Sequence, residues 1–180
     1  KLPLNVPAVA GYEPAFGCLI PTSWLQALGL PPPKITEPNR FQTAIEAPYR
    51  FLQAVAAPMI EQGSGQILMI TSAAGARPTP GAALYSSVRA GATMMAKNLA
   101  GEIAATGVQV NAVGTNFMDF PGFHAAMGSH DPGVRAQVEA AVPMKRLGTM
   151  EEFASFTMAF LDGTSRFTTG QFIAYAGGWV

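Results

Sequence analysis

The sequence predicts an α/β fold in which helices flank a parallel sheet. Short apolar runs of the kind buried in parallel sheets lie at residues 66–72, 108–113 and 172–175, and segments with helical periodicity separate them. The composition favours a folded chain, because 49% of the 180 residues are hydrophobic and only 12% are charged. We expect one domain over residues 1–180.

Proline divides this domain into two parts. Ten of the fifteen prolines lie in residues 1–60, and three of them are consecutive at residues 31–33. We therefore expect an irregular, proline-rich N-terminal part over residues 1–38 and a regular helix–strand part over residues 40–180.

The regular part begins with a predicted helix over residues 40–62. Pro48 lies within it and predicts a kink or a restart. The sequence Gly-Ser-Gly at 63–65 ends the helix, and the first strand follows at 66–72.

A long alanine-rich helix is predicted over residues 82–105, with Gly107 at its C-terminal cap. The strand at 108–113 comes next, and residues 114–132 predict a long loop.

Two further helices are predicted at residues 132–141 and 150–161. The second opens with Thr149 and Glu152, the spacing of a capping box in which each side chain binds the other residue's amide. The strand at 172–175 completes the sheet.

Charge and residue counts exclude several classes of protein. Eleven Lys and Arg balance eleven Asp and Glu, so the chain lacks the cationic face of a nucleic-acid binder or a membrane-surface protein. One cysteine and two histidines supply no zinc ligand set. No apolar run reaches the ~18 residues of a membrane span, and the N-terminus does not resemble a secretory signal. We expect a cytoplasmic protein whose weakly charged surface is partly covered by partner subunits.

Three polar residues stand out as candidates for chemistry. Ser72 ends a buried strand, Tyr85 follows thirteen residues later, and Arg89 lies one turn further on the same helix face. A guanidinium that stays protonated favours the phenolate form of a nearby tyrosine, and Ser72 would share a substrate oxygen with it. The spacing alone also fits a stacked Tyr–Arg pair and a serine that caps a turn.

Over residues 40–180 the sequence resembles the short-chain dehydrogenase/reductase superfamily. The resemblance implies a Rossmann-like parallel sheet whose N-terminal βαβ portion is absent or not recorded. The spacing of Ser72 and Tyr85 matches the superfamily's catalytic pattern, although dehydrogenases carry lysine where Arg89 stands. The blocks that carry the resemblance are 63–72, 85–92, 108–113, 146–152 and 169–172.

Within that superfamily the chain resembles the halohydrin dehalogenases, which use no nicotinamide cofactor. Arg89 followed by Ala-Gly-Ala, the loop at 114–118 and Ala176 carry this resemblance. It implies that Ser72 and Tyr85 hold the hydroxyl of a vicinal haloalcohol, that Tyr85 removes its proton, and that the oxygen displaces the halogen to form an epoxide. The reverse reaction would open epoxides with azide, cyanide or nitrite.

The same resemblance implies a halide-binding loop and a substrate pocket, and it implies no cofactor and no metal. The loop residues are Thr115, Asn116, Phe117 and Met118. The pocket residues are Phe120, Phe123 and His124. We interpret Asp119 and Asp131 as solvated or capping residues of the same loop.

Two other functions stay open. One is an NAD(P)-dependent short-chain oxidoreductase in which Arg89 replaces the usual lysine, although the sequence contains no Gly-x-Gly-x-x-Gly motif. The other is a non-catalytic structural subunit. The family also implies a homotetramer that assembles through the helix at 82–105 and the helix before it.

Overall fold

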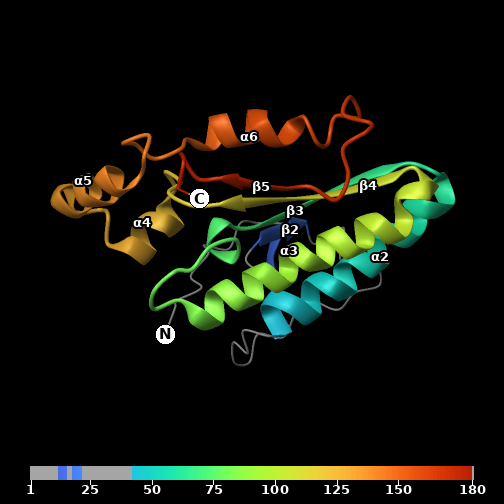
Figure 1. The fold of residues 1–180 in the computed structure, drawn as a ribbon, viewed down its shortest axis with the longest axis horizontal. Helices are drawn as coiled ribbons and strands as arrows, with labels where there is room; N and C mark the ends of the chain where they lie inside the picture. Colours follow the sequence, from blue (N-terminus) through green and yellow to red (C-terminus); the bar gives the residue numbers. More distant parts are fainter. Residues whose placement is uncertain (1–11, 16–17, 22–41, 180) are drawn as a thin grey trace.

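The computed structural model describes residues 12–15, 18–21 and 42–179. Strands β3 (Gly65–Ser72), β4 (Val108–Thr115) and β5 (Phe172–Tyr175) form a parallel sheet in the order β3-β4-β5 (Figure 1). The register pairs Ser72 with Thr115 and Thr115 with Tyr175, so the carboxyl ends of the three strands lie in one row. The predicted α/β class is confirmed.

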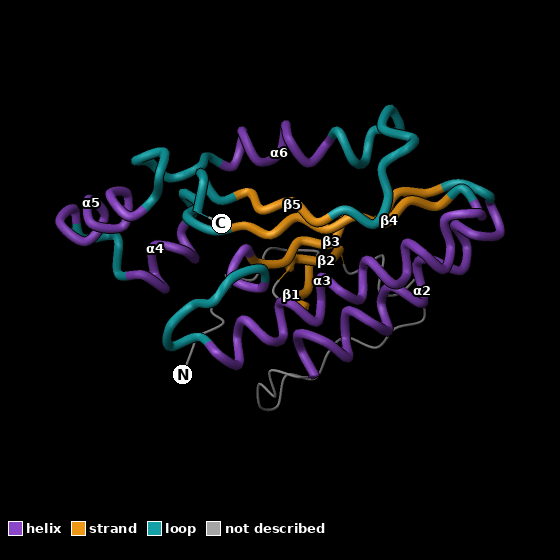
Figure 2. The backbone as a smooth tube through the Cα atoms, in the orientation of Figure 1, coloured by secondary structure: helices purple, strands orange, loops and turns teal. Residues whose placement is uncertain are grey.

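Helices cover both faces of this sheet. A π-helical turn, η1 (Gln42–Glu46), leads into α2 (Ala47–Gln62), and α2 lies beside α3 (Ala83–Ile103) on one face (Figure 2). Helix α6 (Met150–Met158) lies on the other face. None of the helices in the described part of the chain is long and apolar enough to cross a membrane.

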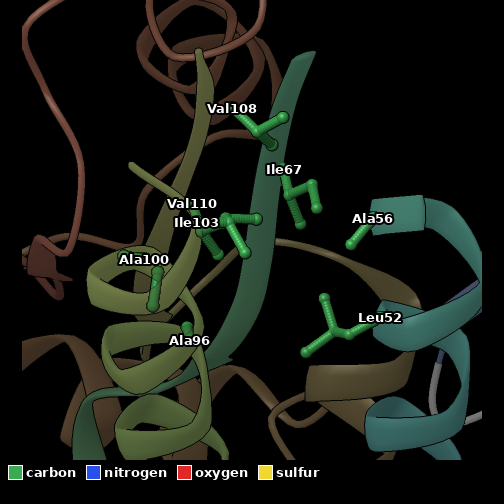
Figure 3. Packing of buried hydrophobic residues seen from close by; sticks show 9 residues of the cluster. Leu52, Ala56, Ile67, Ala96, Ala100, Ile103, Val108 and Val110 are labelled. Atoms are coloured by element: carbon green, nitrogen blue, oxygen red, sulfur yellow. The ribbon is translucent and has the colours of Figure 1, made fainter. Parts of the chain in front are cut away.

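The core lies between the sheet and the α2–α3 pair (Figure 3). Strand β4 is central, and Val110, Ala112 and Val113 are completely buried. Alanines on α3 let this helix approach the sheet closely, while Leu52 and Ala56 of α2 pack against the same core from the side. The buried helix residues of this core are Leu52, Ala56, Ala96, Ala100 and Ile103.

Several predicted boundaries are confirmed by the local chemistry. Helix α2 restarts next to Pro48 and ends at Gly63, whose φ of 71° suits glycine at a helix C-terminus. Thr149 and Glu152 form the predicted capping box of α6. A short 3-10 turn, η3 (Ala104–Thr106), lies between α3 and the left-handed Gly107.

The structure differs from the sequence prediction in three places. Helix α4 (Pro121–Met127) interrupts the segment predicted as a loop, and α6 ends at Met158 rather than at 161. In the N-terminal part predicted as irregular, β1 (Tyr12–Ala15) and β2 (Cys18–Pro21) form an antiparallel hairpin. Helix α4 was not predicted because its first turn contains Pro and Gly, which are typical of loops, and no side chain caps it. The predicted one-domain division stays a prediction, because its boundary lies outside the described residues.

Candidate active site

Ser72 lies at the carboxyl end of β3, and its side chain is buried. Its Oγ accepts a hydrogen bond from the amide of Ala74 at 3.2 Å, which caps the short turn η2 (Ala73–Gly75). The same hydroxyl donates to the carbonyl oxygen of Thr115 at 3.4 Å. The second bond is long and therefore weak, so the hydroxyl proton can be redirected at small cost.

Tyr85 and Arg89 occupy the first turns of α3. The Cζ atom of Arg89 lies 5.1 Å from the centroid of the Tyr85 ring, within the range of a cation–π contact. The guanidinium thus stacks on the phenol, which was the alternative that the spacing left open. Its Nε is buried and has no hydrogen-bond partner within the described structure. A buried N–H without an acceptor is costly, so this donor suits a bound group that offers one.

Close packing brings the backbone of Arg89 against the end of β3. Thr71 Oγ1 donates to the carbonyl oxygen of Arg89 at 3.1 Å. A Cβ added at Gly75 would lie 2.7 Å from the amide nitrogen of Ala90, so only glycine lets the turn after Ser72 approach α3 this closely. The structure therefore brings Ser72 and the Tyr85–Arg89 pair to the same end of the sheet.

The loop that the resemblance assigns to halide already uses several of its polar groups internally. The amide of Asn116 donates to the carbonyl of Tyr175 at 3.3 Å, and the amide of Phe117 donates to the side-chain oxygen of Asn116 at 2.9 Å. Met118 is buried and pairs with Gly148 in a parallel bridge. We call this paired region, residues 117–118 with Gly148, the neck.

Aromatic side chains gather around the neck. The ring of Phe117 makes edge-to-face contacts with Phe123, at 6.2 Å between centroids, and with Trp179, at 5.5 Å. Phe120 packs on Phe123 from outside and is 41% exposed. Arg77, from the loop after η2, stacks on Trp179 at 4.3 Å. Sequence reasoning identified the three phenylalanines and missed Trp179, for which no motif in the sequence gave a signal.

His124 belongs to a polar network and not only to this aromatic wall. Its Nε2 bonds Asp119 Oδ1 at 2.7 Å, and its Nδ1 bonds Ser129 Oγ at 2.8 Å. Arg135 binds the other oxygen of Asp119 at 2.7 Å. Asp119 caps no helix, and its side chain, which is 37% exposed, also joins His124 to Arg135. Asp131 does cap the next helix, α5 (Pro132–Ala141), as expected.

A pocket of about 370 Å³ lies beside the neck, and the predicted pocket residues Phe120, Phe123 and His124 do not line it. Its polar wall contains Arg146 and Glu152, joined by two hydrogen bonds of 2.6 and 2.7 Å. This contact holds the pKa of Glu152 at about 2, with help from the amide of Thr149. Burial and the charge of Glu152 raise the pKa of Tyr175.

The other residues that line this pocket include Asn116, Phe117, Met118, Met144 and Ala176. The candidate catalytic residues Ser72, Tyr85 and Arg89 do not line it.

The described residues also limit what the site can hold. Among them, no group of three or more His, Cys, Asp or Glu side chains is placed to bind a metal ion. The unpaired Nε of Arg89 is instead a donor suited to a hydroxyl or carbonyl oxygen.

Comparisons with known proteins identify reductases as relatives. The family model described as "Enoyl-(Acyl carrier protein) reductase" matches residues 38–180. The chain is 38% identical over 130 residues to the 3-oxoacyl-[acyl-carrier-protein] reductase of Synechocystis sp., covering 71% of this chain and 49% of that protein. It is 32% identical over 130 residues to the enzyme of the same name from Chlamydia muridarum, covering 72% and 51%. The chain thus spans about half the length of these curated relatives.

A solved structure described as "Dehalogenation enzyme" is similar as well. It is 33% identical with a TM-score of 0.70, and the alignment covers 80% of this chain and 61% of that one.

These findings correct the predicted activity. The halohydrin dehalogenase function is wrong, because these two curated relatives and the matching family model are described as reductases. The geometry gives a physical reason, since the amides of Asn116 and Phe117 are bonded within the protein and do not form an open anion nest. The expectation of a cofactor-free reaction depended on that function and loses its basis.

The chain belongs to the short-chain dehydrogenase/reductase superfamily, in the family described as enoyl-(acyl carrier protein) reductase.

Proposed function

We propose that the protein is an NAD(P)-dependent oxidoreductase that reduces a carbonyl group, with a 3-oxoacyl thioester as the first substrate class to test. The observation that carries this proposal is the gathering of Ser72, Tyr85 and Arg89 at one end of the sheet. The names of the relatives support the choice of substrate class.

Tyr85 is the proton donor in this reaction. As the carbonyl oxygen gains electron density, the phenol hydroxyl transfers its proton to it, which is general acid catalysis. Ser72 donates a hydrogen bond to the same oxygen once its 3.4 Å bond to Thr115 is exchanged for one to the substrate. The turn η2 fixes the position of Ser72 during this exchange, because Ala74 still donates to its Oγ.

Arg89 holds the phenol and contributes charge. Its guanidinium stacks on the Tyr85 ring, so a cationic group helps to fix the orientation of the ring. Negative charge that develops on the phenol oxygen is stabilised by this neighbouring cation.

The residues at this end of the sheet fit the nicotinamide end of a dinucleotide. Among the described residues the buried Nε of Arg89 has no acceptor, and a ribose hydroxyl of the cofactor would supply one. When bound, the reduced nicotinamide supplies the hydride that the carbonyl carbon accepts. The fit concerns this end of the cofactor alone, because the sequence contains no Gly-x-Gly-x-x-Gly motif.

Turnover of a 3-oxoacyl thioester with NADPH or NADH, followed by nicotinamide absorbance, tests the proposal. We expect Tyr85→Phe to lower kcat/KM by about 10²- to 10⁴-fold, because the acid is removed. Tyr49→Phe is the matched control, since Tyr49 is a half-exposed tyrosine on α2 whose hydroxyl contacts Gln53, and it should leave the rate unchanged. The proposal is wrong if the wild-type protein reduces no 3-oxoacyl thioester, ketone or aldehyde with either nucleotide, or if Tyr85→Phe is fully active.

The proposed enzyme is a homotetramer that assembles through α2 and α3. Exposed apolar residues on α3, Leu84 and Met94, support this arrangement, and a side chain added at the exposed Gly101 would meet no atom of the described residues within 4 Å. We expect Gly101→Arg to shift the mass measured by light scattering to a smaller species, and a wild-type monomer would contradict the proposal.

A further inference from the structure

Residues 119–144 leave the sheet at the neck, form α4 and α5, and return to the neck. We call this segment the excursion. In Figure 1, α4 and α5 lie beyond the carboxyl ends of the strands, away from the core beneath the sheet. The neck is closed by backbone bonds, in which Gly148 donates to the carbonyl of Phe117 at 2.9 Å and Asp119 donates to the carbonyl of Gly148 at 2.8 Å.

Asp119 joins both helices of the excursion to this neck. One carboxylate oxygen bonds His124 on α4 at 2.7 Å, and the other bonds Arg135 on α5 at 2.7 Å. The amide of Asp119 is bonded to Gly148, so one residue connects three segments. These contacts hold the pKa of the Asp119 carboxyl below its ordinary value, with Arg135 as the largest cause. Arg135 also contacts Glu139 at 2.9 Å, within α5.

The contacts of Ser129, His124 and Asp119 follow the order of a nucleophilic triad, but burial excludes that role. Ser129 is only 2% exposed, so no substrate reaches its hydroxyl. Nε2 of His124 is bonded to Asp119 and Nδ1 to Ser129, so both ring nitrogens have a partner. Such a closed set of hydrogen bonds fixes a position and activates no group.

These hydrogen bonds fix the position of α4, and α4 contacts a residue that lines the pocket. Phe123 precedes His124 on α4, and its ring packs edge-to-face on Phe117 at the neck. Phe117 lines the pocket and contacts Trp179, on which Arg77 stacks from the loop that follows Ser72. A displacement of α4 would therefore remove the packing partner of a pocket residue.

We propose that Asp119 is a positioning residue, which fixes α4 and α5 on the neck and thereby sets the shape of the pocket beside the neck. The proposal rests on the proposed function only for its kinetic consequence, a change in substrate binding. Its structural consequence, the local opening of the excursion, is independent of which reaction the protein catalyses.

Hydrogen exchange by mass spectrometry on Asp119→Ala tests the structural consequence. Charge-assisted hydrogen bonds to two partners are lost, so we expect the amides of residues 119–144 to exchange about 10- to 100-fold faster, with α3 and β4 unchanged. Glu139→Ala is the matched control, because it removes the other carboxylate contact of Arg135 without touching the neck or α4. It should exchange like the wild type over residues 119–130.

Steady-state kinetics on the same variants tests the second consequence. We expect Asp119→Ala to raise KM about tenfold while kcat changes less, because Ser72 and Tyr85 keep their places. If Asp119→Ala does not fold, Asp119→Asn decides the question with the same readouts, since its amide lacks the charge and one of the two acceptor oxygens.

The proposal fails if the folded variant exchanges like the wild type, if α3 and β4 loosen as much as the excursion, if Glu139→Ala has the same effect over residues 119–130, or if kcat falls with KM unchanged. A wild-type protein without reductase activity would overturn the proposed function instead, and the exchange measurement would still decide the role of Asp119.

Discussion

The core around β4 and the excursion at residues 119–144 are held by different interactions. In β4, Val110, Ala112 and Val113 are completely buried, and alanines of α3 pack against the strand. In the excursion, the buried side chains are Ser129, Val138 and Val142, and the polar contacts of Asp119 connect its helices. The first region is specified by a continuous apolar pattern and the second by a few charged groups, so substitutions in the two regions should have different consequences.

The largest difference between the regions is expected for apolar truncations. Leu52→Ala, at a residue 4% exposed in the core, should lower the free energy of unfolding by about 2–5 kcal/mol, because it leaves a cavity between α2 and the sheet. Met127→Ala, at an exposed residue of α4, should change it by about 0.5 kcal/mol or less. Urea unfolding measures both, and equal losses would contradict the distinction.

A smaller loss is expected from a buried polar group within the core region. Asn111 Nδ2 donates to the carbonyl of Thr168 at 2.8 Å, and its Oδ1 accepts from the amide of Gln171 at 3.1 Å, which ties β4 to the segment before β5. Asn111→Ala should cost about 1–3 kcal/mol, since it leaves these backbone groups without partners. Asn98→Ala, at an exposed position of α3, is the control for urea unfolding. A loss of the same size there would show that the buried bonds do not matter.

The smallest effect is expected at the surface contact of Glu152, and it depends on pH. Because Arg146 lowers the pKa of Glu152 from 4.5 to about 2, the contact stabilises the folded state above pH 4.5 and is lost as the pH falls toward 2. The midpoint temperature of thermal unfolding should therefore fall less steeply between pH 5 and 2.5 for Glu152→Gln than for the wild type. Glu151→Gln, at the adjacent exposed position, should follow the wild-type curve, and identical slopes for all three proteins would contradict the assignment.

The sequence was informative where local pattern decides structure. The strands near 66–72 and 108–113 and the long helix after residue 82 could be predicted from apolar periodicity, because burial imposes it. The closeness of Ser72 to the Tyr85–Arg89 pair was also predictable, since a strand end and the following helix start meet at the same edge of a parallel sheet.

The rest depends on contacts that no local pattern reveals. Asp119 and Arg135 are sixteen residues apart, and nothing in the sequence indicates that they bond. The halide interpretation was wrong because the availability of the loop amides depends on where the Asn116 side chain and the Tyr175 carbonyl lie.

The central claim is that Arg89 takes the place of lysine at a nicotinamide-dependent reductase site. The rate of NADPH oxidation with a 3-oxoacyl thioester, compared among wild type, Arg89→Lys and Arg89→Met, tests it most directly. We expect Arg89→Lys to stay within about tenfold of the wild type and Arg89→Met to lose about 10²-fold or more, because methionine keeps the length of the side chain without its charge or its donors. An Arg89→Met variant that oxidises NADPH at the wild-type rate would contradict the claim.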